Sequence, residues 1–232
     1  MSAPPSRRHG GGRTPKEDGR TARARSTRAR ILAAATELFV ANGYTSTSVN
    51  AVAAGAGVGE QTVYYAFGTK RGILTAALDL CVAGDDEPVP TLERPWARDA
   101  IADPDPLGQL RRQVAGAGEI YLRAAPLLDV VRGAATTDPD LAEVWNTNVR
   151  QRLTVLRVFA EALARKTPLR DGLTCELAAD VALTILSPET YNLLVHRRGW
   201  SHARWRGWAF DALVGMLTTL PRPHDGPGEV GT

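Results

Sequence analysis

The side chains best suited to binding chemistry gather in one short stretch, residues 47–70. Amide side chains such as that of Gln61 hydrogen-bond to the edges of bases, whereas hydroxyl and ammonium groups suit phosphate oxygens. Glu60 is left out of the expected set because phosphates repel a carboxylate, although a carboxylate can accept from a cytosine amino group. The stretch therefore predicts contacts with double-stranded DNA by Thr47, Asn50, Gln61, Thr62, Tyr64, Tyr65 and Lys70.

The same stretch is patterned as two short helices joined by a tight turn. Apolar residues repeat at helical spacing from Val49 to Ala53, so the first helix has one apolar face. In the expected helix-turn-helix, Ala53 permits close approach, Gly57 tolerates a positive φ in the turn, and Val63 points back at the first helix. The second helix, about residues 59–67, would then expose the residues that read DNA.

Further motifs surround this pair of helices. They are a helix ending at Ala41-Asn42-Gly43-Tyr44, the run Thr62-Val63-Tyr64-Tyr65-Ala66-Phe67, and then Gly68-Thr69-Lys70-Arg71-Gly72-Ile73-Leu74. Together, residues 26–78 resemble the DNA-binding domain of tetracycline-repressor-type (TetR family) regulators. The resemblance implies that Lys70 contacts a phosphate and that the chain dimerises through its last two long helices. It also implies a small-molecule effector held in a pocket among the middle helices.

The composition excludes several classes of protein. The chain has 232 residues and a net charge of +3, and residues 1–30 hold nine basic side chains against two acidic ones. Cys81 and Cys175 lie far apart and no Cys/His cluster has metal-ligand spacing, so we expect no disulfide framework, metal or cofactor. No segment approaches a membrane span or a secretory signal, which predicts a cytoplasmic protein without membrane contact.

Helical periodicity without any alternating β pattern predicts an all-α fold. Helices are expected over residues 26–42, 70–83, 107–125, 139–165, 174–198 and 201–220. Two shorter helices are expected, one near residues 96–101 and one that begins at Pro126. The expected parts are a disordered basic arm (1–25), an N-terminal three-helix helix-turn-helix domain (26–83), a linker (84–106), a C-terminal helical ligand-binding and dimerisation domain (107–220) and a flexible tail (221–232). The arm is either a solubilising tail or a segment that follows a DNA groove.

Two sets of residues in the C-terminal part carry further hypotheses. Aromatic side chains with a polar group could line the implied effector pocket, which would suit a hydrophobic or aromatic effector. A stripe of Trp and small residues on the last helix could pair with a second copy of the chain. Ordinary core packing remains open for both sets. The pocket set is Tyr121, Trp145 and Asn148, and the dimer set is Leu194, Trp205, Trp208, Ala212 and Met216.

The sequence thus predicts a DNA-binding transcriptional regulator, a homodimeric repressor released from a palindromic operator by an effector. A transcriptional activator with the same architecture and a helical small-molecule-binding protein without DNA binding are the alternatives. An enzyme is not expected, because the Asp, Glu, His and Cys residues are scattered and no phosphate-binding loop occurs.

Overall fold

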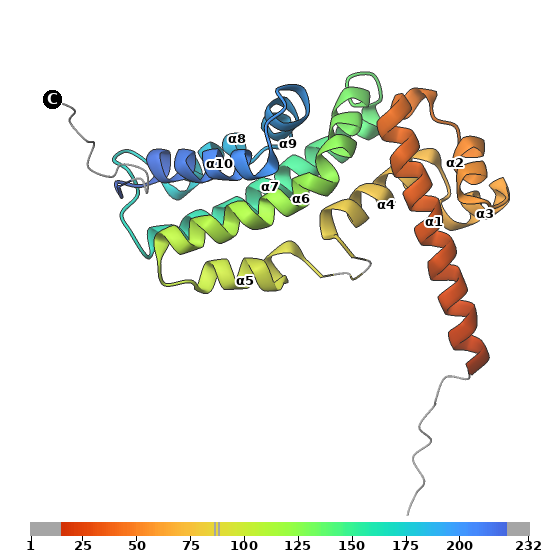
Figure 1. The fold of residues 1–232 in the computed structure, drawn as a ribbon, viewed down its shortest axis with the longest axis horizontal. Helices are drawn as coiled ribbons and strands as arrows, with labels where there is room; N and C mark the ends of the chain where they lie inside the picture. The colour runs from red at the N-terminus through yellow and green to blue at the C-terminus, as the bar shows by residue number, and fades with distance from the viewer. Residues whose placement is uncertain (1–14, 86, 88, 222–232) are drawn as a thin grey trace, which may run out of the picture.

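The structure is a computed structural model that describes residues 15–85, 87 and 89–221 (Figure 1). Within those residues the chain is helical and forms no strand, apart from one isolated antiparallel bridge between Leu169 and Thr218. The all-α prediction is confirmed. The helices are α1 (Pro15–Ser46), α2 (Val49–Ala56), α3 (Glu60–Phe67), α4 (Lys70–Ala83), α5 (Pro95–Ala102), α6 (Pro106–Ala134), α7 (Pro139–Ala164), α8 (Cys175–Ile185), α9 (Pro188–Tyr191) and α10 (His202–Leu217).

Two long helices, α6 and α7, form the body of the molecule, and the others cover it (Figure 1). At one end α1, α2, α3 and α4 make the helix-turn-helix part, with α1 and α4 packed on α6. At the other end α8 packs on α7, α10 packs on α6 and α8, and α5 covers the opposite side of α6. None of the helices in the described ranges is long and apolar enough to cross a membrane.

The hydrophobic core of the helix-turn-helix part extends into α6. Ile31 and Phe39 of α1 and Leu74 of α4 share one buried cluster with Leu127 and Leu128 of α6. All of these side chains are at most 1% exposed. Because burial of apolar surface is the main stabilising term, α6 holds the helix-turn-helix end to the rest of the chain.

The N-terminal helix is longer than the sequence predicted. Residues 15–25, expected to be a disordered arm, form the first turns of α1, while residues 1–14 of that arm lie outside the described part. Extending an existing helix needs no new nucleus, and Ala and Arg are good helix formers, so exposed turns can continue it. At the other end α1 is interrupted at Gly43, with φ of 79°, next to the expected end at residue 42.

Helix α6 runs through Pro126, where the sequence predicted a break between two helices. A proline inside a helix removes one hydrogen bond to the carbonyl four residues earlier, here that of Leu122. The Leu122 side chain is 52% exposed, so water can reach this part of the helix. The neighbours Ala125 and Leu127 are fully buried, and their packing offsets the lost bond. The break predicted at Ser187-Pro188 is confirmed, with Ser187 capping α9.

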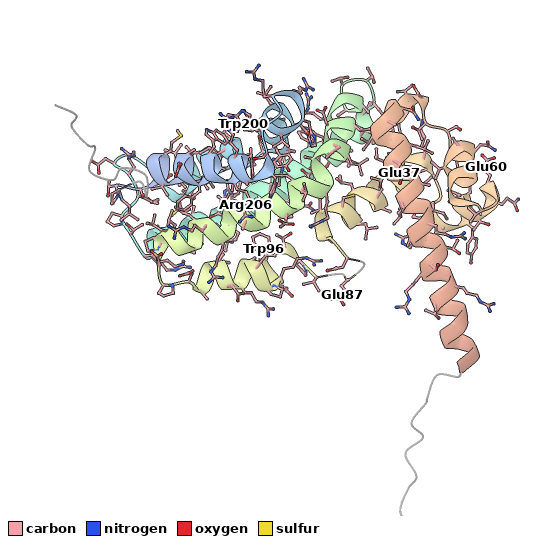
Figure 2. The ribbon with its side chains drawn as sticks, viewed as in Figure 1. Glu37, Glu60, Glu87, Trp96, Trp200 and Arg206 are labelled. Atoms are coloured by element: carbon pink, nitrogen blue, oxygen red, sulfur yellow. The ribbon has the colours of Figure 1, made fainter. Side chains whose placement is uncertain are left out.

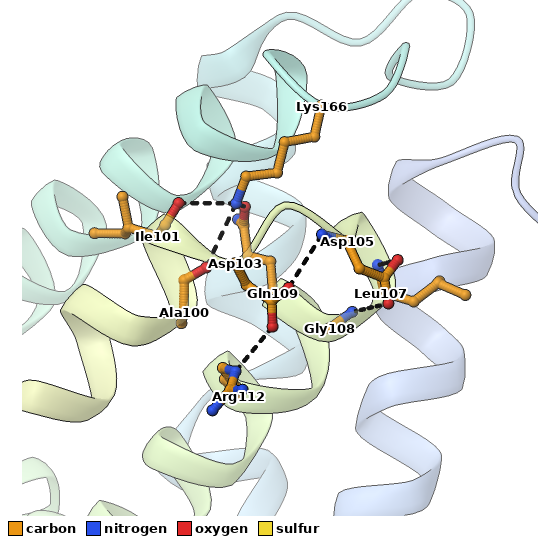
Figure 3. Close-up of polar contacts among 9 residues, drawn as sticks. All are labelled: Ala100, Ile101, Asp103, Asp105, Leu107, Gly108, Gln109, Arg112 and Lys166. Atoms are coloured by element: carbon orange, nitrogen blue, oxygen red, sulfur yellow. Dashed lines mark hydrogen bonds and ion pairs between the residues drawn. The ribbon is translucent and has the colours of Figure 1, made fainter.

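A polar clamp fixes α5 on the bundle (Figure 3). The ammonium group of Lys166 donates to the carbonyls of Ala100 at 3.4 Å and Ile101 at 2.9 Å, and to Oε1 of Gln109 at 2.5 Å. The Gln109 amide in turn donates to the carbonyl of Phe159 at 2.8 Å. The carbonyl end of α5 is therefore tied to both α6 and α7, within a largely buried site where each such bond counts.

Gly72 at the junction of α3 and α4 offers a test of this packing. A Cβ at residue 72 would overlap the carbonyl oxygen of Phe67, so Gly72→Ala should lower the free energy of unfolding by about 1–3 kcal/mol. Gly133→Ala is the matched control because a Cβ there meets nothing within 4 Å, and it should be neutral or stabilising by up to about 1 kcal/mol. Urea denaturation measures both. Equal stability of the two variants would contradict the close packing of Gly72 against the Phe67 carbonyl.

Candidate functional site

Caps at both ends hold α2 and α3 at a fixed angle. The Ser48 hydroxyl accepts from the Ala51 amide at 3.0 Å and begins α2. Gly57 ends α2 in the left-handed region, with φ of 64°, and the Val58 amide then donates to the Ala53 carbonyl at 3.0 Å. Val63 of α3 is fully buried in the same cluster as Ala53. The roles that the sequence predicted for Ala53, Gly57 and Val63 are those that the structure shows.

The opposite face of α3 is open to solvent at one end of the molecule, where Figure 2 labels Glu60. Val63 is the buried residue of this helix, whereas Gln61, Thr62, Tyr64 and Tyr65 are exposed. The Tyr65 side chain is 95% exposed and that of Tyr64 is 48% exposed. These four predicted contact residues thus share one helix that the bundle leaves uncovered.

Glu60 and Asn50 connect the two helices on this exposed surface. The Asn50 amide donates to Oε2 of Glu60 at 3.5 Å, which joins α2 to the first turn of α3. A carboxylate in the first turn also interacts favourably with the helix dipole. Glu60 therefore stabilises the helix pair, a role that phosphate repulsion alone does not reveal.

Thr47 and Lys70 instead brace the interrupted end of α1. The Thr47 side chain is buried, and its Oγ1 donates toward the carbonyls of Gly43 at 2.8 Å and Leu38 at 3.1 Å. The sequence predicted that Thr47 contacts DNA together with exposed residues of α3, but in the structure its hydroxyl is turned toward the backbone of α1. The Lys70 ammonium donates to the Tyr44 carbonyl at 2.9 Å and lies 4.3 Å from the centre of the Tyr44 ring.

Two arginines also lie beside the helix-turn-helix. The Arg28 guanidinium lies over the Phe67 ring at 4.7 Å, at the end of α3. A terminal nitrogen of Arg30 lies 3.8 Å from where a Cβ of Gly57 would be, next to the turn. They place positive charge beside the turn that precedes α3 and beside the last residue of α3.

A cavity of about 110 Å³ lies between α4, α5, α6 and α7. Its wall is mainly apolar and aromatic, with Trp96 of α5 stacked on Phe159 of α7 at 6.0 Å between ring centres. The clamp described above positions Trp96, and Gly116 of α6 makes room for it, since a Cβ there would overlap the indole ring. Figure 2 labels Trp96 on the segment that covers this side of α6.

The predicted pocket residues divide into lining and supporting groups. Tyr121 and Asn148 line the cavity, whereas Trp145 does not and packs with the helix-turn-helix core. The Tyr121 hydroxyl donates to the Leu186 carbonyl at 2.6 Å. Burial raises the pKa of Tyr121, and the nearby Arg152 guanidinium, which lowers it, does not cancel this effect. The phenol therefore stays protonated at neutral pH.

The cavity and the helix-turn-helix core share part of one wall. Val82 of α4, together with Ile120 and Leu128 of α6, lines the cavity and also packs with the cluster that holds α1 and α2. In addition, Arg71 of α4 forms an ion pair with Asp140 in the first turn of α7. A change of shape in the cavity therefore acts on residues that position the exposed helix pair.

The predicted dimer residues also occupy different environments. Trp205 is fully buried, with its ring 4.9 Å from that of Tyr191 and 5.9 Å from that of Tyr121. The structure corrects the prediction for Trp205, because a side chain within the protomer core cannot pack against a partner. Leu194, Trp208 and Ala212 are half-buried and Met216 is 51% exposed. On α8, Leu177 is 47% exposed beside α10.

Comparison with known proteins agrees with this architecture. Residues 31–77 match the family model described as bacterial regulatory proteins, tetR family. No curated protein sequence matches the chain. The predicted tetR-type helix-turn-helix domain is therefore confirmed for that segment.

Solved structures with the same fold extend the similarity over most of the chain. FadR from Bacillus subtilis in complex with stearoyl-CoA is 18% identical with a TM-score of 0.65, over 80% of this chain and 97% of that chain. NalD, the secondary repressor of the MexAB-OprM multidrug efflux pump in Pseudomonas aeruginosa, is 21% identical with a TM-score of 0.63, over 84% and 98%. A transcriptional regulator from Saccharomonospora viridis in complex with choline is 18% identical with a TM-score of 0.59, over 82% and 96%. The chain thus has the fold of tetR-family transcriptional regulators.

Thr47 and Thr62 should respond differently to loss of their hydroxyl groups. Thr47→Val removes the hydroxyl that donates to the part-buried carbonyls of Gly43 and Leu38, so it should lower the free energy of unfolding by about 1–2 kcal/mol. Thr62→Val removes an exposed hydroxyl and should change the free energy of unfolding by less than about 0.5 kcal/mol. Thermal or urea unfolding distinguishes them. Equal effects would show that the Thr47 hydroxyl does not brace α1.

Proposed function

We propose that this chain is a tetR-family transcriptional regulator that binds a palindromic DNA operator as a homodimer. In this proposal it represses transcription and is released from the operator by a small-molecule effector. NalD, which shares the fold, is described as a repressor, and this supports the sign of regulation proposed here. An activator would use the same architecture, and a promoter–reporter assay with and without the protein separates the two.

The exposed face of α3 is the observation that carries the proposal. The Tyr65 side chain is 95% exposed, so it contributes little to the stability of the protomer. An exposed aromatic side chain of this kind suits contact with a binding partner. The caps around α2 and α3 hold that face rigidly, which reduces the entropy cost of binding. A helix of this size, held by a perpendicular partner, fits the major groove of B-DNA.

The proposal assigns distinct roles to the residues on this surface. Gln61 reads a base edge, because an amide can both donate and accept. Thr62, Tyr64 and Tyr65 contact the phosphate backbone and set the register. Lys70 donates to the Tyr44 and Thr45 carbonyls, and its remaining N–H is the one proposed to bind a phosphate. Asn50 contacts DNA from α2, where its amide is also hydrogen-bonded to Glu60 of α3.

Symmetry supports a dimer as the active form. One recognition helix contacts only a few base pairs, whereas two helices on a rigid scaffold bind a palindrome with linked affinity. We place the interface on α8 and α10, which lie side by side and expose Leu177 and Met216. Ala212 and Trp208 lie about one and two turns before Met216 on α10. A second copy would bury this stripe in a four-helix bundle.

The cavity supports control by a ligand. Two structures with this fold contain bound small molecules, stearoyl-CoA in one case and choline in the other. In this chain the cavity shares Val82 and Leu128 with the helix-turn-helix core. An effector that fits the cavity in only one arrangement of α4 and α6 would shift the dimer toward that arrangement. The spacing of the two recognition helices would then no longer match the operator.

Tyr65→Ala tests the DNA-reading surface. The variant should bind a duplex obtained by in-vitro selection about tenfold more weakly, with an unchanged melting temperature because the side chain is exposed. Leu122→Ala is the matched control, since Leu122 is also exposed but lies on α6 away from α3. Fluorescence anisotropy measures both affinities. Unchanged affinity of Tyr65→Ala would contradict the assignment of this surface.

Ala212→Glu tests the dimer surface. Burying a charge against its symmetry copy is strongly unfavourable, so the variant should run as a folded monomer in sedimentation equilibrium. Ala203→Glu is the control because residue 203 is exposed on the opposite side of the same helix. It should remain a dimer. A dimeric Ala212→Glu with native circular dichroism would place the interface elsewhere.

A further inference from the structure

The cavity wall contains a cation without a complete set of partners. Arg152 of α7 lines the cavity, and its Nε donates to Oδ1 of Asn148 at 3.0 Å. Its Nη1 exposes less than 1 Å² and has no hydrogen-bond partner among the described residues. The guanidinium lies over the Trp145 ring at 5.6 Å. Within the described ranges, no carboxylate oxygen lies within 4.0 Å of a guanidinium nitrogen of Arg152, the distance limit for an ion pair.

A guanidinium in this state calls for an anion. Arg152 is half-buried as a residue, but its Nη1 is removed from water, and an unpaired N–H in an apolar setting carries the cost of its desolvation. The neighbouring Tyr121 hydroxyl directs its proton to the Leu186 carbonyl and carries no charge that could offset that of Arg152. A carboxylate matches the planar fork of a guanidinium better than any other common anionic group except phosphate.

A second polar group faces the same space. Gln113 of α6 is 4% exposed, lines the cavity and makes no hydrogen bond within the described part of the chain. Buried amides are normally paired, so one that is unpaired beside a cavity suits a ligand oxygen. Together, Gln113 and Arg152 offer donors from two helices that face each other across the cavity.

The rest of the wall defines the body of the ligand. Trp96 and Phe159 supply aromatic surface, and the cavity measures about 110 Å³. The cavity is smaller than the ~150 Å³ that holds one benzene ring, so a single ring is the upper limit and part of the ligand would extend into the adjoining space. A groove of about 660 Å³ shares Asn148 and Val155 with the cavity and leads outward past Asp79 and Glu143. Glu143 is paired with Arg150 at 2.7 Å, but Asp79 disfavours an anion in the groove, so the favoured position for a negative charge is the inner one.

We propose that the cavity binds a small aromatic monocarboxylate, with the carboxylate on Arg152 and Gln113 and the ring against Trp96 and Phe159. This rests on the proposed function, because it names the chemical class of the effector. A phosphate monoester of the same ring would demand a second positive charge, and none of the other described lining residues of the cavity is basic.

Calorimetric titration of the full chain with phenylacetate and its neutral isostere phenylacetamide tests the proposal. The native protein should bind phenylacetate at least about tenfold more tightly than phenylacetamide, since a hydrogen bond to a charged group is the difference between them. In R152M the two affinities should become equal within about twofold. Arg157→Met, which removes an exposed arginine from the same helix, should keep the native preference.

Each other outcome has a defined meaning. Equal binding of the two probes by the native protein, binding of neither probe, or a preference retained in R152M would overturn the proposal. Should R152M fail to fold, judged by its melting curve, R152Q takes its place with the same expectation. A mobility shift with selected DNA, run on the same proteins, separates the two levels. If the protein binds the operator but shows no preference for the carboxylate, only the proposed ligand class is wrong. If it binds the carboxylate through Arg152 but does not shift DNA, the ligand class is supported and the proposed function as a DNA-binding regulator is wrong.

Discussion

The structure depends on the burial of one helix, α6, in two hydrophobic cores. Leu127 and Leu128 pack with α1 and α4 at the DNA-reading end, whereas Leu110 and Tyr121 pack with the C-terminal helices. Because apolar burial is strong and packed cores resist small changes of volume, α6 cannot move relative to one core without disturbing the other. The same helix also forms a wall of the cavity. The exposed helix pair and the cavity are thus mechanically connected.

The helix-turn-helix was predictable because its determinants are local. Ala53, Gly57 and Val63 act within a few residues of one another, and a cap or a positive φ is readable from residue type. The course of α6 through Pro126 was not, because the packing of Leu127 on another part of the chain overrides the local preference. Thr47 was grouped with exposed residues since one of its acceptors, the Leu38 carbonyl, lies nine residues earlier in the preceding helix.

The C-terminal part shows the same limit more strongly. Periodicity identified Trp205 and Trp208 as one stripe, yet the first is fully buried against Tyr121 and Tyr191 and the second is half-buried. Residues three apart on a helix differ by about 60° in direction, and only tertiary contacts decide which of them faces inward. The unpaired Nη1 of Arg152 likewise has no sequence signature. It depends on which side chains α4, α5 and α6 place around it.

DNA reading by the exposed face of α3 in a two-fold symmetric protein can be measured by in-vitro selection from a random duplex library with the purified full chain. We expect an enriched palindrome whose half-sites are about one helical turn apart or a multiple of it, and its loss when Gln61 and Tyr65 are both replaced by alanine. No enrichment, with or without phenylacetate present, would show that α3 does not read DNA in this way.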